Sequence, residues 1–181
     1  MIIGITGRKQ SGKDTFYNVA LERIGNVKRV AFADPVKQEL AEALGVIPEE
    51  IEFNKKRYRK ALQLWGTEIR RELFGRDYWI KRARLIIGGL AYNDPNALII
   101  VTDVRFPNEA EAVRDMGGVI VKVIRKRPFW TRVKSMFKRE HASERLVDTI
   151  TADYTIHNNG AECDYWRKVN ESLEAIYAKA S

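Results

Sequence analysis

The chain has 181 residues, 45% of them hydrophobic, which is enough for one domain with a core of ordinary size. It carries a formal net charge of +8 and a single cysteine, Cys163, so an internal disulfide is excluded and a reducing cytoplasm is the expected location. No apolar stretch reaches about 18 residues and no basic leader precedes the first apolar run, so we expect neither a transmembrane helix nor a signal peptide.

A glycine loop follows the first predicted strand, residues 1–6, and precedes a predicted helix over residues 16–24. It has the pattern G-x-x-x-x-G-K, from Gly7 to Lys13. The glycines allow the backbone N–H groups to converge on a phosphate, and the lysine adds a mobile charge for the outer phosphates of a nucleotide. The predicted phosphate-binding residues are Gly7, Lys9, Ser11, Gly12, Lys13, Asp14 and Thr15.

The residue after the loop lysine is unusual for this pattern. A serine or threonine is usual there, but the chain has Asp14, and the hydroxyl comes one place later at Thr15. Mg²⁺ prefers hard oxygen ligands, so either side chain is a candidate for holding the ion. The sequence leaves this choice open.

The next predicted elements are a strand over residues 28–33 and a helix over residues 35–44. Asp34 is the predicted N-cap, with Pro35 in the first helical position. Lys37 lies in the first turn, near the carboxyl end of the strand, which is the edge where open α/β sheets bind ligands.

Residues 48–60 are charged and poorly periodic, so we expect mostly loop with a short helix there. A helix is predicted over residues 61–74, and Gly66 inside it indicates close approach of a ligand or of another helix. Asp77 is the predicted cap of a further helix, residues 78–92.

A continuous apolar strand over residues 97–102 leads into Asp103, and Arg105 follows. A carboxylate at the end of such a strand, in a chain that has a phosphate loop, has the place of an aspartate that positions Mg²⁺. A helix is predicted from Pro107 to residue 116.

The last predicted strands cover residues 119–124 and 153–157, and a helix is predicted over 165–178. Between the two strands, residues 125–145 carry eight Lys and Arg against two Glu, which favours an anionic partner such as nucleotide phosphates or nucleic acid. Five strands that alternate with helices predict the α/β class: a three-layer, doubly wound, five-stranded parallel sheet.

Three features favour transfer of a phosphoryl group to a small acceptor: a helical insert after the second strand, the basic excursion, and an arginine beside the presumed metal aspartate. Such a reaction needs alignment and charge neutralisation, and a lid that excludes water. We therefore expect one kinase domain with a core of residues 1–34, 93–125 and 150–181, an acceptor-binding insert of residues 35–92, and a lid of residues 126–149.

Seven segments also carry a resemblance. They are Gly7 to Thr15, Phe32 to Lys37, Leu62 to Arg71 with its G-T-E-x-x-R pattern, Asp77-Tyr78-Trp79, Thr102 to Ala110 with D-V-R-F-P-N-E-A, His141 to Glu144, and Asp153 to Gly160. Together, and in this order, they resemble the bacteriophage deoxynucleoside monophosphate kinases over nearly the whole chain. Asp14 after the loop lysine also resembles that family.

The resemblance implies ATP- and Mg²⁺-dependent phosphorylation of a deoxynucleoside 5′-monophosphate to the diphosphate, in a host-cell cytoplasm. It also implies a homodimer, with nucleic acid not expected as a partner. The implied catalytic residues are Lys13, Asp103, Arg105, Arg127 and Arg132, and the implied metal ligands are Asp14 or Thr15 together with Asp103. The implied acceptor-binding residues are Asp34, Lys37, Trp65, Glu68, Arg71, Trp79 and Arg105, and Asn158 and Gly160 are expected beside the donor adenine.

Other readings stay open. Animal-type phosphomevalonate kinases share a similar loop and strand end, and dephospho-coenzyme A kinases share the architecture; Trp65, Tyr78 and Trp79 favour an acceptor with a base, on which they are suited to stack. In other classes, a nucleic-acid-binding protein would use the basic segment with steep salt dependence, and a regulatory switch would bind ATP without acceptor-stimulated turnover.

Overall fold

A parallel five-stranded sheet forms the centre of the computed structural model, which describes residues 1–126 and 146–180 and, within them, only the backbone of residues 67, 68, 71 and 180. The strand order is β2-β3-β1-β4-β5, and every neighbouring pair is parallel. The strands are β1 (Ile2–Thr6), β2 (Val27–Val30), β3 (Leu98–Val104), β4 (Val119–Ile124) and β5 (Tyr154–His157). The predicted fold class is confirmed.

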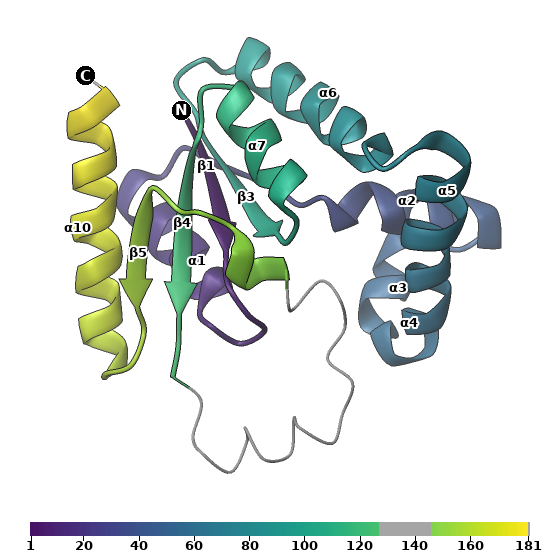
Figure 1. Ribbon diagram of the computed structural model, residues 1–181, viewed down its shortest axis with the longest axis horizontal. Helices are drawn as coiled ribbons and strands as arrows, with labels where there is room; N and C mark the ends of the chain where they lie inside the picture. Colours follow the sequence, from purple (N-terminus) through teal and green to yellow (C-terminus); the bar gives the residue numbers. More distant parts are fainter. Residues whose placement is uncertain (127–145, 181) are drawn as a thin grey trace.

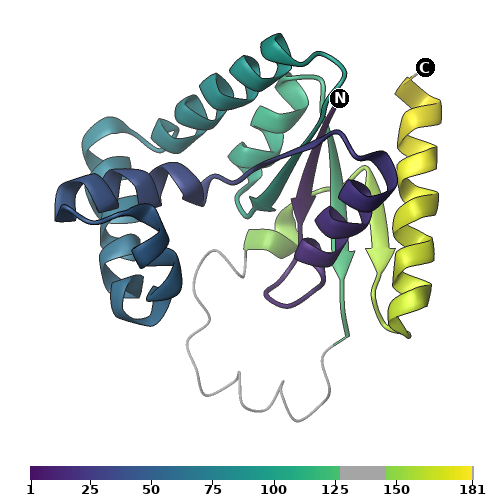
Figure 2. The same ribbon diagram turned by 180° about the vertical axis from the view of Figure 1, so that it is seen from behind.

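Helices cover both faces of this sheet (Figures 1 and 2). One layer is α1 (Lys13–Ile24) and α10 (Glu162–Ala180), and the other includes α6 (Tyr78–Asn93) and α7 (Pro107–Asp115). A short 3-10 turn, η2 (Val147–Thr149), precedes β5.

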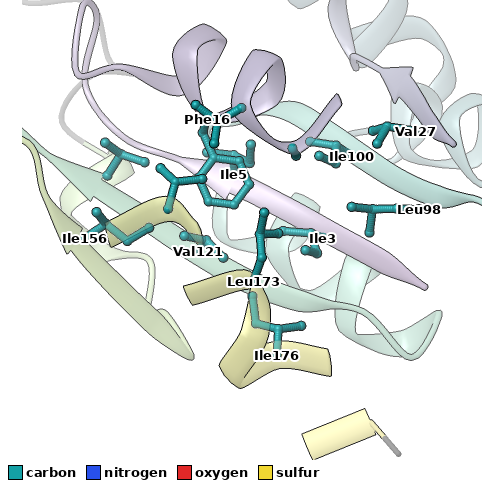
Figure 3. Packing of buried hydrophobic residues seen from close by; sticks show 14 of the residues in the cluster. Ile3, Ile5, Phe16, Val27, Leu98, Ile100, Val121, Ile156, Leu173 and Ile176 are labelled. Carbon is teal, nitrogen blue, oxygen red and sulfur yellow. The ribbon is translucent and has the colours of Figure 1, made fainter. Parts of the chain in front are cut away.

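Alternate residues of β3 serve the two layers, because successive side chains of a strand point to opposite faces. Leu98 and Ile100 pack with α1 and α10, whereas Ile99 and Val101 pack with α6 and α7. Figure 3 shows the first of these clusters, in which Phe16 of α1 lies against the centre of the sheet. Both faces of the central strands are buried, which explains their continuous apolar sequences.

The part of the predicted insert that precedes α6, residues 33–77, is helical apart from short turns and stands to one side of the sheet (Figure 1). Its elements are α2 (Ala33–Leu44), α3 (Pro48–Phe53), α4 (Lys55–Gln63), the π-helical segment η1 (Leu64–Ile69) and α5 (Arg70–Phe74). The expectation of a mostly looped segment over 48–60 is wrong. Ile51 and Tyr58 bury one face of α3 and α4 against α2, and charged residues occupy the rest of those helices.

The helix predicted over residues 61–74 is instead the end of α4 followed by η1 and α5, so a π-helical turn interrupts it. Gly66 lies in that turn, and a Cβ atom there would lie 3.2 Å from Cγ1 of Val36 on α2. The close helix approach that this glycine predicted is therefore confirmed. None of the described helices combines the length and the apolarity needed to cross a bilayer.

Candidate active site

The loop from Gly7 to Gly12 joins β1 to α1 at the carboxyl edge of the sheet, and its backbone needs glycine at both ends. Gly7 has φ 153° and Gly12 has φ 113°. A Cβ atom on Gly7 would lie 2.5 Å from the carbonyl oxygen of Val123, and one on Gly12 would lie 2.5 Å from the side-chain amide of Asn158. Glycine is thus required at both positions, because a larger residue would be strained and would clash with the neighbouring chain.

Lys13 bends back over this loop. Its Nζ donates to the carbonyl oxygens of Gly7, at 2.8 Å, and Arg8, at 3.0 Å. Ser11 is 2% exposed, and among the described residues its hydroxyl has no hydrogen-bond partner; the same holds for the buried Thr6 hydroxyl. A glycine loop at a helix N-terminus, an ammonium group and an unpartnered buried hydroxyl are a donor set that fits the polyphosphate of a nucleotide.

Two side chains from the C-terminal part of the chain support the loop. The amide of Asn158, just after β5, donates to the carbonyl oxygen of Ser11 at 2.8 Å, and the Tyr165 hydroxyl on α10 donates to that of Gly12 at 2.8 Å. Burial raises the pKa of Tyr165 well above its ordinary value, so this hydroxyl keeps its proton. Asn158 thus has a structural task in the loop, and its place beside the adenine, like that of the exposed Gly160, stays a prediction.

We expect Tyr165→Phe to weaken ATP binding several-fold, because the Gly12 carbonyl loses the donor that fixes the end of the loop. The free energy of unfolding should fall by about 1 kcal/mol, the usual size for one hydrogen bond. Titration calorimetry with ATP and urea unfolding measure the two effects. Tyr92→Phe, at a residue 87% exposed, is the matched control. An unchanged ATP affinity in Tyr165→Phe would show that the loop does not depend on this contact.

Asp103 lies near the end of β3 and holds the start of α2. Its Oδ1 accepts a hydrogen bond from the backbone N–H of Phe32 at 2.7 Å, and its Oδ2 accepts one from Ala33 at 3.0 Å. Burial raises the pKa of Asp103, although these two bonds and the positive charge of Arg105 act in the opposite direction. Each carboxylate oxygen accepts one of these bonds and has a further lone pair, so Asp103 can still bind a metal ion, as the sequence predicts.

Asp34 does not cap α2, and that prediction is wrong. The helix begins at Ala33, one residue before Asp34, and its N-terminal amides are already satisfied by Asp103. The Asp34 carboxylate accepts hydrogen bonds from Arg29, at 3.2 Å, and Lys37, at 3.0 Å. It lies at the entrance to the insert as part of a charged network.

The metal ligands expected at the loop differ in exposure. Asp14 is exposed and Thr15 is half-buried, both in the first turn of α1. Among the described residues, no three His, Cys, Asp or Glu side chains gather into a metal cluster. This donor set suits Mg²⁺, which is commonly held by one or two protein oxygens together with substrate phosphates and water.

Arg105 sits on a turn that a buried carboxylate holds in place. Glu109 on α7 is 3% exposed, and its Oε2 accepts hydrogen bonds from the backbone N–H groups of Arg105, at 2.8 Å, and Phe106, at 3.1 Å. The Arg105 side chain is exposed.

The sequence analysis assigned no functional role to Glu109. A glutamate in the first turn of a helix that begins with proline is the pattern that could have indicated its hydrogen bonds to the preceding backbone.

Arg8 connects the loop to the segment that precedes β5, which the sequence did not indicate. Its Nε and Nη2 donate to the two carboxylate oxygens of Asp148 at 3.2 and 2.5 Å. Lys122 on β4 donates to the carbonyl oxygens of Asp148 and Ile150. The predicted lid arginines Arg127 and Arg132 lie outside the described residues.

The predicted acceptor residues lie in or next to the insert but differ in their surroundings. Lys37 Nζ lies 3.0 Å from an Asp34 oxygen and 2.8 Å from a Glu52 oxygen. Burial alone would lower the pKa of Lys37, but these two partners outweigh it and raise the pKa. Trp65 is half-buried, with its indole N–H directed at Glu39.

Trp79 does not line an open pocket, contrary to the expectation that it stacks on a base. It is 2% exposed, and its indole N–H donates to the carbonyl oxygen of Gly66 at 2.7 Å. The indole thus links α6 to η1, and its ring is in edge contact with Tyr78, with centroids 4.8 Å apart. The side chains of Glu68 and Arg71 lie outside the described part, and only their backbone can be placed, in η1 and α5.

The sequence model of one protein family, described as "Deoxynucleotide monophosphate kinase", matches residues 46–169. The chain belongs to this family. Among individual relatives, it is 28% identical over 144 residues to a putative deoxynucleotide monophosphate kinase of Acanthamoeba polyphaga mimivirus, covering 69% of this chain and 74% of that protein.

Two phage members of the deoxynucleotide monophosphate kinase family also match. The deoxynucleoside-5′-monophosphate kinase of Escherichia phage T5 is 36% identical over 104 residues, covering 55% of this chain and 37% of that protein. The deoxynucleotide monophosphate kinase of Escherichia phage RB69 is 29% identical over 115 residues, covering 64% of this chain and 44% of that protein. The match thus spans less than half the length of both phage proteins.

Solved structures confirm the architecture of this family member and no more than that. A dephospho-CoA kinase from Campylobacter jejuni superimposes with a TM-score of 0.53 at 14% identity, covering 99% of this chain and 98% of the other. A sugar kinase from Janibacter gives 0.51 at 14% identity, covering 96% and 94%.

Proposed function

We propose that this protein transfers a phosphoryl group from ATP, with Mg²⁺, to a deoxynucleoside 5′-monophosphate and so forms the diphosphate. One observation carries the proposal beyond family membership. Thr6 of β1 pairs with Val104 of β3, so the loop leaves the sheet directly beside the strand end that carries Asp103 and Arg105. Neighbouring strands lie about 4.8 Å apart, which supports a site shared by the phosphate loop and these two residues.

The chemistry needs little covalent work by the protein, because phosphoryl transfer depends on alignment and on neutralising charge. Lys13 would bind the outer phosphates and Arg105 would stabilise the charge that develops during transfer. Asp103 would hold Mg²⁺ together with Asp14 or Thr15, and the ion would supply neutralisation of phosphate charge. Arg127 and Arg132 remain the proposed lid arginines, which would close over the phosphates.

The acceptor would bind between the loop and the insert. We keep Asp34, Lys37, Trp65, Glu68 and Arg71 as its proposed contacts, and we give Trp79 a supporting role behind them because it is buried. A homodimer in a host-cell cytoplasm stays part of the proposal.

A panel of monophosphates tests this function. The protein is incubated with ATP·Mg²⁺ and each of the four deoxynucleoside monophosphates, their ribose counterparts, phosphomevalonate and dephospho-coenzyme A, and ADP formation is followed. We expect stimulation by at least one deoxynucleoside monophosphate and by neither of the last two. If only those two stimulate, the acceptor assignment is wrong; if none does, the protein is not this kinase.

The nucleic-acid alternative makes a different prediction in the same protein preparation. It requires oligonucleotide binding whose affinity falls steeply with salt. A kinase should instead bind mononucleotides and show acceptor-stimulated turnover, so oligonucleotide binding without turnover would favour the alternative.

A further inference from the structure

The arm of the phosphate loop that follows Gly7 is held through both its backbone and a side chain. At the backbone, the Arg8 carbonyl oxygen accepts hydrogen bonds from Lys13 Nζ at 3.0 Å and from the Ser11 N–H at 3.1 Å. At the side chain, the Arg8 guanidinium donates through Nε and Nη2, one nitrogen to each carboxylate oxygen of Asp148. A two-point contact of this kind fixes the orientation of the guanidinium as well as its distance from the carboxylate.

Asp148 presents its carboxylate from a turn that is itself anchored. Val147, before it in η2, and Ile150, two residues after it, are 2% and 3% exposed. Lys122 on β4 donates to the carbonyl oxygens of Asp148, at 3.1 Å, and Ile150, at 2.8 Å. Lys122 is also paired in register with Thr6 of β1, the residue directly before the loop. The turn that carries Asp148 is therefore attached to the same pair of strands from which the phosphate loop leaves the sheet.

The binding of ATP would change the backbone part of this arrangement. The Lys13 ammonium donates to the carbonyl oxygens of Gly7 and Arg8 in the structure. Under the proposed function the same ammonium binds the outer phosphates, so these carbonyls would lose part of their hydrogen bonding when ATP is bound. The contact between Arg8 and Asp148 does not use the ammonium, so it can hold this arm of the loop with and without ATP.

We propose that Asp148 is a positioning residue for ATP: through Arg8, it keeps the Gly7–Arg8 arm of the loop in place while Lys13 binds the phosphates. The inference rests on the proposed function, which gives Lys13 that task. Asp148 would act by preorganisation, because a loop arm that is already held need not be ordered when the ligand binds. Its contribution is modest, because the side chains of Arg8 and Asp148 are 38% and 53% exposed and solvent screens an exposed ion pair.

The sign of the effect separates positioning from simple electrostatics. A carboxylate near a phosphate site repels the ligand, so removal of Asp148 should tighten ATP binding if charge alone mattered. Tighter binding is also expected if Asp148 withholds Arg8 from the phosphates. Positioning predicts the reverse: Asp148→Ala should bind ATP about threefold to fivefold more weakly, toward the upper end of what an exposed ion pair contributes.

Titration calorimetry with ATP compares the wild type with Asp148→Ala and with a matched control, Asp115→Ala. Asp115 ends α7 and pairs with Arg84, and their side chains are 60% and 42% exposed, so this variant also loses an exposed ion pair and should bind ATP like the wild type. In steady-state assays of Asp148→Ala, KM for ATP should rise, while kcat and KM for the acceptor stay near the wild-type values. A lower free energy of unfolding with unchanged ATP affinity would make Asp148 a purely structural residue and overturn the proposal.

A double-mutant cycle tests whether Asp148 acts through Arg8. Arg8→Gln should itself weaken ATP binding, because it removes the contact and a positive charge from the loop. In an Arg8→Gln background, Asp148→Ala should weaken ATP binding no further. Further weakening in that background would show that Asp148 acts by another route, and it would overturn the proposal.

The outcomes separate this inference from the proposed function. A wild type that binds ATP but forms no ADP with any monophosphate would overturn the proposed function, and the calorimetric comparison would still decide the role of Asp148. A wild type that does both, with an Asp148→Ala variant that binds ATP as tightly or more tightly, would overturn this inference alone. A wild type that binds no ATP would overturn both.

Discussion

Lys13→Ala is expected to reduce phosphoryl transfer by at least about a thousandfold while the protein still folds. The lysine directly follows the second glycine of the loop, and its Nζ lies at the two loop carbonyls of Gly7 and Arg8. Loss of one preorganised donor to a developing charge typically costs two to three powers of ten, and a thousandfold corresponds to about 4 kcal/mol of barrier. The measurement is the rate of ADP formation at saturating acceptor.

The folded state should tolerate the same change. Lys13 donates two hydrogen bonds to carbonyls at a partly buried position, so the free energy of unfolding should fall by less than about 2 kcal/mol, which urea unfolding can measure. Lys81→Ala, at an exposed lysine of α6, provides a control for removal of a charge elsewhere. Turnover that survived in Lys13→Ala would mean that the reaction centre lies elsewhere.

The sheet could be predicted almost completely because its strands are continuous apolar runs separated by clear turn and cap residues. Residues 119–124 form a strand with the predicted bounds, and the helices predicted at 16–24 and 78–92 appear with modest extensions. The insert was harder to predict. Helix α4 is mostly charged, and Tyr58 is its buried residue, so its sequence shows little helical periodicity. The π-helical segment η1 then shifts the spacing of the side chains that follow it, which an α-helical pattern does not anticipate.

The loop residues of the candidate site could be predicted because the G-x-x-x-x-G-K pattern places glycine where the backbone of a phosphate-binding loop requires it. Residues that act through tertiary contacts could not be predicted. The sequence predicted Asp34 as the cap of α2, but the amides at the start of that helix donate to Asp103, which lies about 70 residues later in the sequence. Pro35 and Glu39 are four residues apart and lie on the same buried side of α2. A charged residue at a core-facing helix position was the sequence signal that Glu39 has buried partners. Its partners Trp65, Arg70, Tyr78 and Arg82 come from later elements, and only the fold brings them together.

Arg105→Ala is the second large expected effect, with a fall in kcat of about a thousandfold or more at saturating ATP and acceptor. An arginine fork fits the equatorial oxygens of a transferring phosphoryl group, and arginines in that role are worth three to five powers of ten. The structure favours such a role because Glu109 fixes the backbone of the turn through two hydrogen bonds, so the exposed side chain starts from a rigid base beside the strand end.

The kinetic pattern decides between two roles for Arg105. If it stabilises the transition state, kcat and kcat/KM for the acceptor should fall together, and Arg105→Lys should recover only part of the loss because a point charge cannot fork. If it only orients the bound acceptor, KM should rise while kcat stays near the wild-type value, and the catalytic assignment would be wrong. Arg167→Ala, an exposed arginine paired with Glu171 on α10, should leave both constants unchanged. Because Glu109 holds the backbone of Phe106 as well as that of Arg105, substituting it would disturb both residues, so the side chain of Arg105 is the cleaner position for this test.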